Sequence, residues 1–217
     1  MKKNLLDNYC YTVADNSTDP AKQEKILYEC KISDIPYIRL KAMPAYYSGS
    51  LSHGMALNWV YRNYIKPKNP RFFGFIDHDI FPIRPHSIIQ HLEKSPAYGY
   101  LQEKDVGGRK RWYLWPGFVF FDYNFVKNKN LDFSPQRGVD TGGRLWKMLY
   151  SNLDKGAVIE PRHGYADFPP GTSTARNFYE YIGDWAHTFD GSNWIKKDRG
   201  EFERRQAAVD LLLKKYY

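Results

Sequence analysis

The spacing of hydrophobic residues changes repeatedly between the period of a strand and that of a helix. Short hydrophobic or alternating runs predict strands over residues 9–14, 36–40, 72–76, 97–102, 113–122 and 156–160. Helical spacing predicts helices over residues 21–31, 53–65, 86–94, 140–153 and 201–217. Residues 161–193 follow neither pattern and predict a long irregular segment, which in a compact domain is usually functional. Strands that alternate with helices are typical of an α/β domain.

Two carboxylates follow the predicted strand 72–76, where Asp77-His78-Asp79 ends the hydrophobic run. On an extended chain, residues two apart leave the same face, with their Cα atoms about 6.6 Å apart. A hard divalent cation takes oxygen ligands at about 2.1 Å, so both carboxylates would reach one ion if the strand end curls. Ligands of open α/β sheets bind at the carboxyl ends of strands. The motif therefore predicts an Asp-x-Asp metal site that holds a diphosphate.

Two polar loops are further candidates, and each has a plain structural alternative. Residues 15–19 (DNSTD) follow the first predicted strand and are typical of turns and helix caps. They form either a capped turn between strand and helix or a turn that contacts a ligand. Residues 105–111 (DVGGRKR) combine glycines with Arg109 and Arg111. They form either a solvated loop or a cationic lid over phosphates.

Composition limits the class of protein. A chain of 217 residues with 42% hydrophobic residues predicts one globular domain. The net charge of +8 predicts attraction to anions such as nucleotide sugars, nucleic acids or acidic membranes. Two cysteines, Cys10 and Cys30, are too few for a disulfide framework, so we expect a reducing compartment.

The chain has no sequence feature typical of a secretory signal or of a membrane span. Residues 1–8 lack the apolar core of a signal peptide, and no run reaches the roughly 20 apolar residues of a membrane span. We therefore expect a soluble, cytoplasmic protein. The basic, amphipathic helix 201–217 is expected to pack on the core, with peripheral membrane contact as the alternative.

Three segments, in this order, resemble the GT-A class of nucleotide-sugar glycosyltransferases, especially its large inverting, family-2-like group. Residues 13–17 (VADNS) resemble the segment that contacts the nucleoside. Residues 52–58 (SHGMALN) resemble the helical segment that precedes the metal strand, and residues 75–79 (FIDHD) resemble the Asp-x-Asp motif itself. The order and spacing of the three are more specific than any one of them alone.

Two later segments fit the same resemblance more loosely. Residues 140–143 (DTGG) lie where the family often keeps its catalytic carboxylate at the start of a helix. His187, followed by Gly191, Ser192 and Trp194, resembles a C-terminal loop whose histidine completes the metal site. The resemblance then covers about residues 9–194.

The resemblance implies a single GT-A-like, Rossmann-type α/β domain over residues 1–217, with a mostly parallel central sheet flanked by helices. Residues 9–100 would form the nucleotide-sugar-binding half, residues 101–200 the acceptor-binding half, and residues 201–217 a C-terminal helix. The implied activity is metal-dependent transfer of a sugar from a nucleoside diphosphate sugar, expected to be UDP-linked, to a hydroxyl acceptor such as a glycan. The implied cofactor is Mn²⁺ or Mg²⁺, and inversion at the anomeric carbon is expected.

The resemblance also assigns roles to individual residues. The metal ligands would be Asp79, Asp77 and His187. The donor would be contacted by Asp15, Asn16, Ser17, His53, Asn58, Asp77, Arg109 and Arg111. Asp140 would be the general base that deprotonates the acceptor hydroxyl, with Glu160 and Asp167 as reserves. The rings of Trp112, Tyr113 and Trp115 would stack on apolar sugar faces, unless they are buried in the core.

Two other classes of function remain open. A metal-dependent phosphoryl or nucleotidyl transferase also needs paired carboxylates, but it usually adds a third acidic ligand and a second metal. The sequence has no obvious third clustered carboxylate. A basic nucleic-acid-binding module would account for the charge and the aromatic residues, yet no known basic and aromatic signature is present. The sequence therefore favours the glycosyltransferase, with no nucleic acid among its partners.

Overall fold

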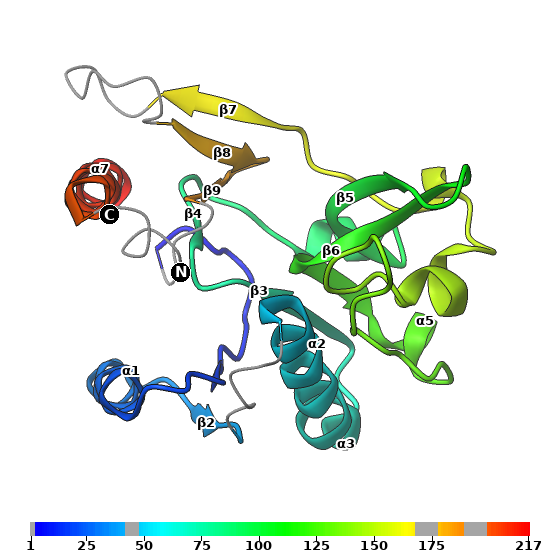
Figure 1. Ribbon diagram of the computed structural model, residues 1–217, viewed down its shortest axis with the longest axis horizontal. Coiled ribbons are helices and arrows are strands. Elements are labelled where there is room, and N and C mark those ends of the chain that lie inside the picture. Colours follow the sequence, from blue (N-terminus) through cyan, green and yellow to red (C-terminus); the bar gives the residue numbers. More distant parts are fainter. Residues whose placement is uncertain (1–2, 42–47, 168–177, 189–198) are drawn as a thin grey trace.

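The computed structural model describes residues 3–41, 48–167, 178–188 and 199–217 (Figure 1). Its helical elements are α1 (Pro20–Ile32), α2 (Gly49–Val60), η1 (Tyr61–Ile65), α3 (Lys66–Lys68), α4 (Ile89–Leu92), α5 (Tyr123–Val126), η2 (Trp146–Tyr150), η3 (Lys155–Ala157) and α7 (Arg199–Tyr216). Its strands are β1 (Val13–Asp15), β2 (Tyr37–Arg39), β3 (Phe72–Ile76), β4 (Ile80–Pro82), β5 (Ala97–Asp105), β6 (Lys110–Asp122), β7 (His163–Asp167), β8 (Phe178–Ile182) and β9 (Trp185–His187).

The strands of the described residues pair in three separate sheets. β1 and β2 form a two-stranded parallel sheet. The other two sheets, in the orders β3-β6-β5 and β4-β9-β8-β7, are antiparallel throughout. The prediction of a mostly parallel central sheet is therefore wrong, and with it the GT-A-like, Rossmann-type arrangement. The reason is that hairpins, rather than helical crossovers, connect β5 to β6 and β8 to β9, and a hairpin makes neighbours antiparallel.

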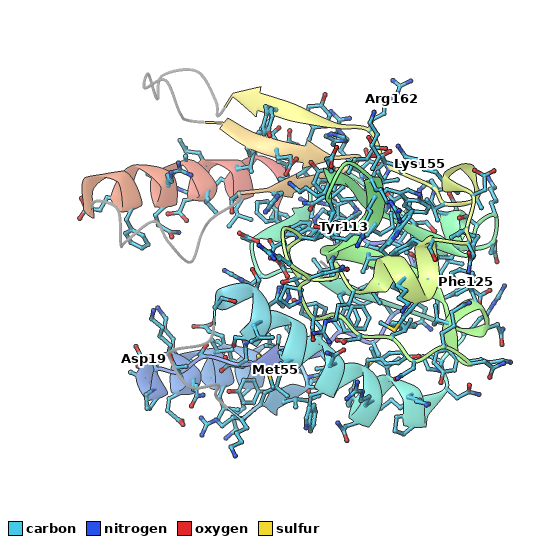
Figure 2. The ribbon with its side chains drawn as sticks, turned by 45° about the vertical axis from the view of Figure 1, so that its right-hand side comes forward. Asp19, Met55, Tyr113, Phe125, Lys155 and Arg162 are labelled. Atoms are coloured by element: carbon cyan, nitrogen blue, oxygen red, sulfur yellow. The ribbon has the colours of Figure 1, made fainter. Side chains whose placement is uncertain are left out.

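β6 is the longest strand and organises the core. It pairs with β3 on one side and with β5 on the other, and most of its side chains are buried. Tyr113 lies in this interior, whereas Lys155 and Arg162 lie at the periphery (Figure 2). The ladder is interrupted at residues 115–117, as the Trp-Pro-Gly sequence predicts, because Pro116 has no N–H to donate. That interruption leaves backbone groups of β6 available to the end of β3.

α1 and α2 were both predicted as helices, and α2 begins earlier in the chain than its sequence predicts. Asp19 caps α1 by accepting a hydrogen bond from the Ala21 N–H (2.9 Å), and Pro20 is its first residue. α2 begins at Gly49 with Ser48 as its cap, rather than near Ser52. It continues into the π-helical turn η1 because Pro67 lacks an N–H and cannot close the normal helical bond.

Three local predictions are wrong. Residues 156–160 form the turn η3 and an isolated bridge from Ile159 to Tyr98 instead of a strand. Residues 140–153 form a series of turns followed by η2 rather than a regular helix from Asp140. The segment predicted to be irregular contains β7, β8 and β9 in its described part.

The C-terminal helix packs as expected. Ala208 and Leu212 of α7 are buried against Ile83, Tyr179 and Ala186. The Tyr217 hydroxyl donates a hydrogen bond to the backbone oxygen of Pro82 (2.5 Å). Among the described residues, no helix has the length and apolar character that a bilayer crossing requires.

Candidate functional site

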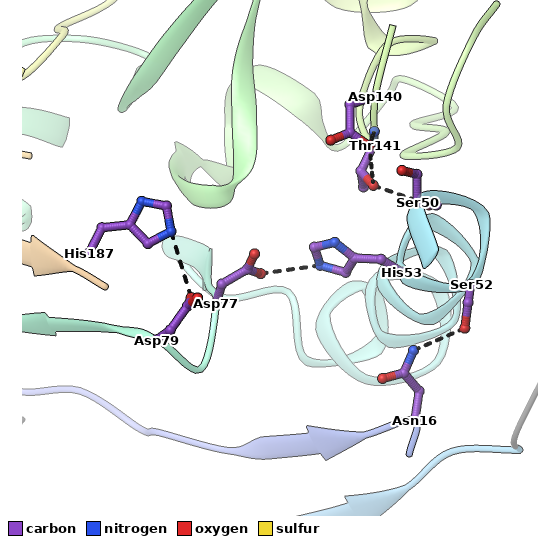
Figure 3. Close-up of polar contacts among 9 residues, drawn as sticks. All are labelled: Asn16, Ser50, Ser52, His53, Asp77, Asp79, Asp140, Thr141 and His187. Carbon is purple, nitrogen blue, oxygen red and sulfur yellow. Dashed lines mark hydrogen bonds and ion pairs between the residues drawn. The ribbon is translucent and has the colours of Figure 1, made fainter. Parts of the chain in front are cut away.

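The chain turns immediately after β3, and this turn separates the two carboxylates of the Asp-x-Asp motif. The Asp77 N–H donates to the Gly117 oxygen of β6 (2.8 Å), and the Ile80 N–H donates back to the Asp77 oxygen (3.2 Å). Figure 3 shows that Asp77 then points to His53 on α2, while Asp79 points to His187 on β9. The motif therefore contacts two different histidines, one on each side.

On the α2 side, His53 Nε2 lies 3.3 Å from Asp77 Oδ1. Burial alone would lower the pKa of His53, but the hydrogen bond with Asp77 and the charges of Asp77, Asp140 and Asp79 raise it. Burial would likewise raise the pKa of Asp77, but its contact with His53 lowers it. One imidazole thus lies in the field of three carboxylates from two distant segments of the chain.

On the β9 side, His187 Nε2 lies 3.8 Å from Asp79 Oδ1. The other ring nitrogen, Nδ1, contacts Glu180 Oε2 of β8 at 2.8 Å. The backbone fixes this arrangement, because the Thr188 N–H donates to the Asp79 oxygen (3.0 Å) next to the β4–β9 ladder. His187 and Glu180 are both buried.

Asp140 lies on an exposed loop that α2 holds in place (Figure 3). Its Oδ1 accepts the Thr141 N–H (2.7 Å), and the Thr141 hydroxyl donates to the Ser50 oxygen of α2 (3.1 Å). The Asp140 carboxylate does not cap a regular helix, because the following residues form turns. Its contact is with the next residue rather than with the second or third residue of a helix.

Asn58 of α2 is buried and holds the other end of that loop. Its amide nitrogen donates to Asp132 Oδ1 (2.9 Å) and to the Ser134 hydroxyl (3.2 Å), and its oxygen accepts the Phe133 N–H (2.9 Å). The helix and loop are so close at Gly54 that an added Cβ would lie 2.7 Å from the Phe133 oxygen. Asn58 is therefore hydrogen-bonded to the protein itself, as a buried amide requires.

The predicted nucleoside segment lies near the same helix. Asp15 is buried and accepts hydrogen bonds from the Ser17 N–H (2.8 Å) and the Tyr37 hydroxyl (2.7 Å). These bonds outweigh the effect of burial and lower the pKa of Asp15. Asn16 reaches the Ser52 hydroxyl of α2 at 3.3 Å (Figure 3). Asp15 thus stabilises the turn through its bond with Ser17, while Asn16 contacts α2 at Ser52.

Arg109 and Arg111 do not join this cluster. Arg109 is exposed at the hairpin between β5 and β6, and Arg111 lies opposite Lys104. At about 3.3 Å per residue, Arg111 is about 13 Å along the strand from Trp115, which borders the site. The predicted phosphate lid is thus separated from the Asp-x-Asp turn in this conformation.

The alternative bases and the predicted stacking residues do not form one cluster. Glu160 lies 3.7 Å from His163. The side chain of Asp167 lies outside the described residues, as do Gly191, Ser192 and Trp194. Trp112 and Tyr113 are buried in the core, so they cannot form an acceptor platform. Only Trp115 of the three is half-buried.

Trp115 borders the site directly. Its ring lies 5.2 Å from the His187 ring, and it folds over Gly117, where an added Cβ would lie 2.2 Å from the indole. The same Gly117 accepts the Asp77 N–H. Gly117 therefore brings Trp115, Asp77 and His187 together.

The residues present suit a cation that is shared with a substrate, rather than one held by the protein alone. No group of three or more histidine, cysteine, aspartate or glutamate side chains in the described segments is arranged to hold a metal ion. Mg²⁺ is usually bound through one or two carboxylates together with substrate phosphates. The Asp79–His187 separation of 3.8 Å is shorter than twice a metal–ligand bond of about 2.1 Å, so both atoms can reach one ion. Carboxylate with imidazole suits Mn²⁺ better than Mg²⁺.

Glu180 is the site residue that the sequence predictions missed. The signal was present, because residues 178–187 read FYEYIGDWAH, two short aromatic runs joined by Gly183-Asp184. Gly183 has a positive φ of 59°, as a tight hairpin turn requires. A two-residue turn of this kind places Glu180 directly opposite His187.

Comparisons of the chain with protein-family models, with curated proteins and with solved structures found no match.

Proposed function

We propose that the protein is a glycosyltransferase that transfers a sugar from a nucleoside diphosphate sugar, with a UDP-linked sugar as the expected donor, to a hydroxyl acceptor such as a glycan. The reaction proceeds with inversion and requires Mn²⁺ or Mg²⁺. When bound, the cation neutralises the charge that develops on the leaving diphosphate.

One observation carries the proposal. Asp77 contacts His53 of α2 at 3.3 Å, and Asp140, more than sixty residues further along the chain, lies next to Thr141, which is hydrogen-bonded to Ser50 of the same helix. A paired-carboxylate turn and a third, exposed carboxylate therefore lie beside the same helix. This is the arrangement that an inverting transfer needs, with charge control for the leaving group and a separate base for the acceptor.

Each residue has a defined task in this proposal. Asp79 and His187 bind the cation, and Asp77 orients His53 beside the donor. The raised pKa of His53 favours its protonated form, which donates a hydrogen bond to a phosphate oxygen of the donor. Asp140 accepts the proton of the acceptor hydroxyl as that oxygen attacks the anomeric carbon. Trp115 lies at the edge of the site, where its half-buried ring can contact a sugar face.

The test combines binding and product analysis. Thermal unfolding is measured with a panel of nucleoside diphosphate sugars, each with and without Mn²⁺. A ligand that binds only the folded protein, at about 100 times its Kd, stabilises it by about 2.7 kcal/mol. The expected result is stabilisation by a UDP-sugar that requires Mn²⁺, followed by release of UDP when acceptor hydroxyls are supplied.

Other outcomes identify the rival classes. Release of a nucleoside monophosphate or of pyrophosphate would overturn the proposal in favour of phosphoryl or nucleotidyl transfer. Salt-dependent binding of oligonucleotides that persists in Asp79→Ala, without nucleotide-sugar binding, would overturn it in favour of a nucleic-acid-binding module.

A further inference from the structure

Glu180 and His187 form a buried pair across the hairpin of β8 and β9. They are opposite each other in the ladder, and Glu180 Oε2 lies 2.8 Å from His187 Nδ1. Side chains directly opposite on neighbouring strands extend from the same face, so the contact is imposed by the strand register. Glu180 contacts Nδ1 of the His187 ring, while Asp79 faces the other ring nitrogen, Nε2.

The Glu180 carboxylate is directed at one nitrogen of the His187 ring. Its Oε2 lies 2.8 Å from Nδ1, and the Tyr100 hydroxyl also interacts with it. A carboxylate accepts hydrogen bonds, so this contact places a proton on His187 Nδ1. In a neutral imidazole the lone pair is then on Nε2, the atom that lies 3.8 Å from Asp79 Oδ1.

Two neighbours restrict how the His187 ring can turn. The Trp115 ring lies 5.2 Å away on one side, and the backbone bond from Thr188 to Asp79 fixes the position of the strand. Together with the Glu180 contact, these neighbours restrict the orientation of the ring. Histidines that bind metals commonly donate their second N–H to a carboxylate in this way.

We propose that Glu180 is a positioning residue, which holds His187 in the tautomer and orientation that let Nε2 bind a divalent cation together with Asp79. This inference rests on the proposed function, because that function requires the cation. Tyr100 supports Glu180 through its hydroxyl and acts one step further from the ion.

The chain offers a matched control in a second pair of the same kind. Asp184 Oδ2 lies 3.0 Å from Nδ1 of the buried His86, in the same hairpin as Glu180. His86 is surrounded by the rings of His91, Tyr98 and Trp185 and does not face Asp79. Asp184→Asn therefore removes a carboxylate–imidazole contact without touching the proposed ion site.

The experiment measures Mn²⁺ binding directly, both with Mn²⁺ alone and with Mn²⁺ plus UDP. The EPR signal of free Mn²⁺ gives the Kd, and pulsed EPR detects the nitrogen coupling of a bound imidazole. We expect Glu180→Gln to weaken Mn²⁺ binding by about 10- to 100-fold and to reduce the nitrogen coupling. Asp184→Asn keeps the wild-type Kd, and Tyr100→Phe weakens binding by a few-fold in the same direction.

The outcomes separate this inference from the proposed function. Mn²⁺ affinity within twofold of wild type in folded Glu180→Gln overturns the inference, as does the absence of Mn²⁺ binding to the wild type with UDP. Should Glu180→Gln fail to fold, Tyr100→Phe decides, and an unchanged Kd there overturns the inference. If Mn²⁺ binding depends on Glu180 but no sugar is transferred, the inference stands and the proposed function falls.

Discussion

The two sides of the Asp-x-Asp turn use the same pair of residue types in different surroundings. On the α2 side, the side chains of His53 and Asp77 are 30% and 26% exposed and lie 3.3 Å apart. On the β9 side, the side chains of His187 and Asp79 are 10% and 13% exposed and lie 3.8 Å apart. Only the β9 histidine is also held by a second, buried carboxylate. The first pair is thus a closer contact that is more open to solvent, while the second is less exposed, has a longer separation and includes a histidine held by Glu180.

The difference in exposure indicates that the two sides of the turn have different roles. Charges that are shielded from water interact more strongly with an ion between them, and a fixed ring loses less entropy on binding. The β9 side is therefore suited to hold a cation. The α2 side is more accessible and is suited to contact a substrate that enters and leaves.

The largest effect should come from the β9 side. Asp79→Ala removes the carboxylate oxygen that faces His187 Nε2. We therefore expect Mn²⁺-dependent UDP binding to be lost and turnover to fall by about 10³-fold. Asp77→Ala should weaken UDP binding by about tenfold and leave a Mn²⁺ requirement. Calorimetric titration of each variant with UDP and Mn²⁺ measures both effects. The reverse order of the two variants would place the cation on the α2 side.

Asp140→Asn should produce the next largest effect, and only on turnover. The amide keeps the volume of the side chain but cannot accept the proton of the acceptor, so we expect kcat to fall by about 10²- to 10⁴-fold. The affinity for UDP and Mn²⁺ should stay at the wild-type value. Steady-state kinetics with a saturating donor measure kcat. Unchanged turnover would move the role of base to Glu160 or Asp167.

The smallest effect concerns acid stability on the α2 side. Burial raises the pKa of Asp132, but hydrogen bonds from Ser134, Asn58 and Arg144 outweigh it and lower the pKa from 3.8 to about 2. A folded-state pKa below the unfolded value adds stability above pH 4, which is lost as the pH falls towards 2. We expect a loss of about 1–2 kcal/mol from this group.

Other carboxylates also titrate in this range, so the measured quantity is a difference between two proteins. Urea unfolding of wild type and Asp132→Asn is compared at pH 5 and at pH 2.5. The wild type should lose more stability than the variant by the stated amount. Equal losses in the two proteins would show that the Asn58–Asp132 contact does not support the loop of Asp140.

Local features near the site were predictable because their causes are local. The hydrophobic run ending at Asp77 gave β3, the turn residues around Asp19 gave the start of α1, and the interruption at residues 115–117 followed from Pro116. Each depends on neighbours in the sequence, such as a cap or a missing N–H. The structure also brings two residues that the resemblance singled out next to the motif, since His53 contacts Asp77 and His187 contacts Asp79.

The sheets could not be predicted in the same way, because a hydrophobic pattern does not identify the partner of a strand. Residues 113–122 are as hydrophobic as a central parallel strand, yet β6 pairs antiparallel on both sides. The partners of Asn58 could not be predicted, because they lie more than seventy residues away, at Asp132 to Ser134. Glu180 was missed because its hairpin was read as irregular.

The crowding at Gly117 limits how this site can be altered. Since even a methyl group there would collide with the indole of Trp115, position 117 cannot gain a side chain while position 115 keeps its tryptophan. The two positions therefore form a single unit for protein engineering. A smaller residue at 115 would have to accompany any enlargement at 117, and the ring contact with His187 would change in the same step.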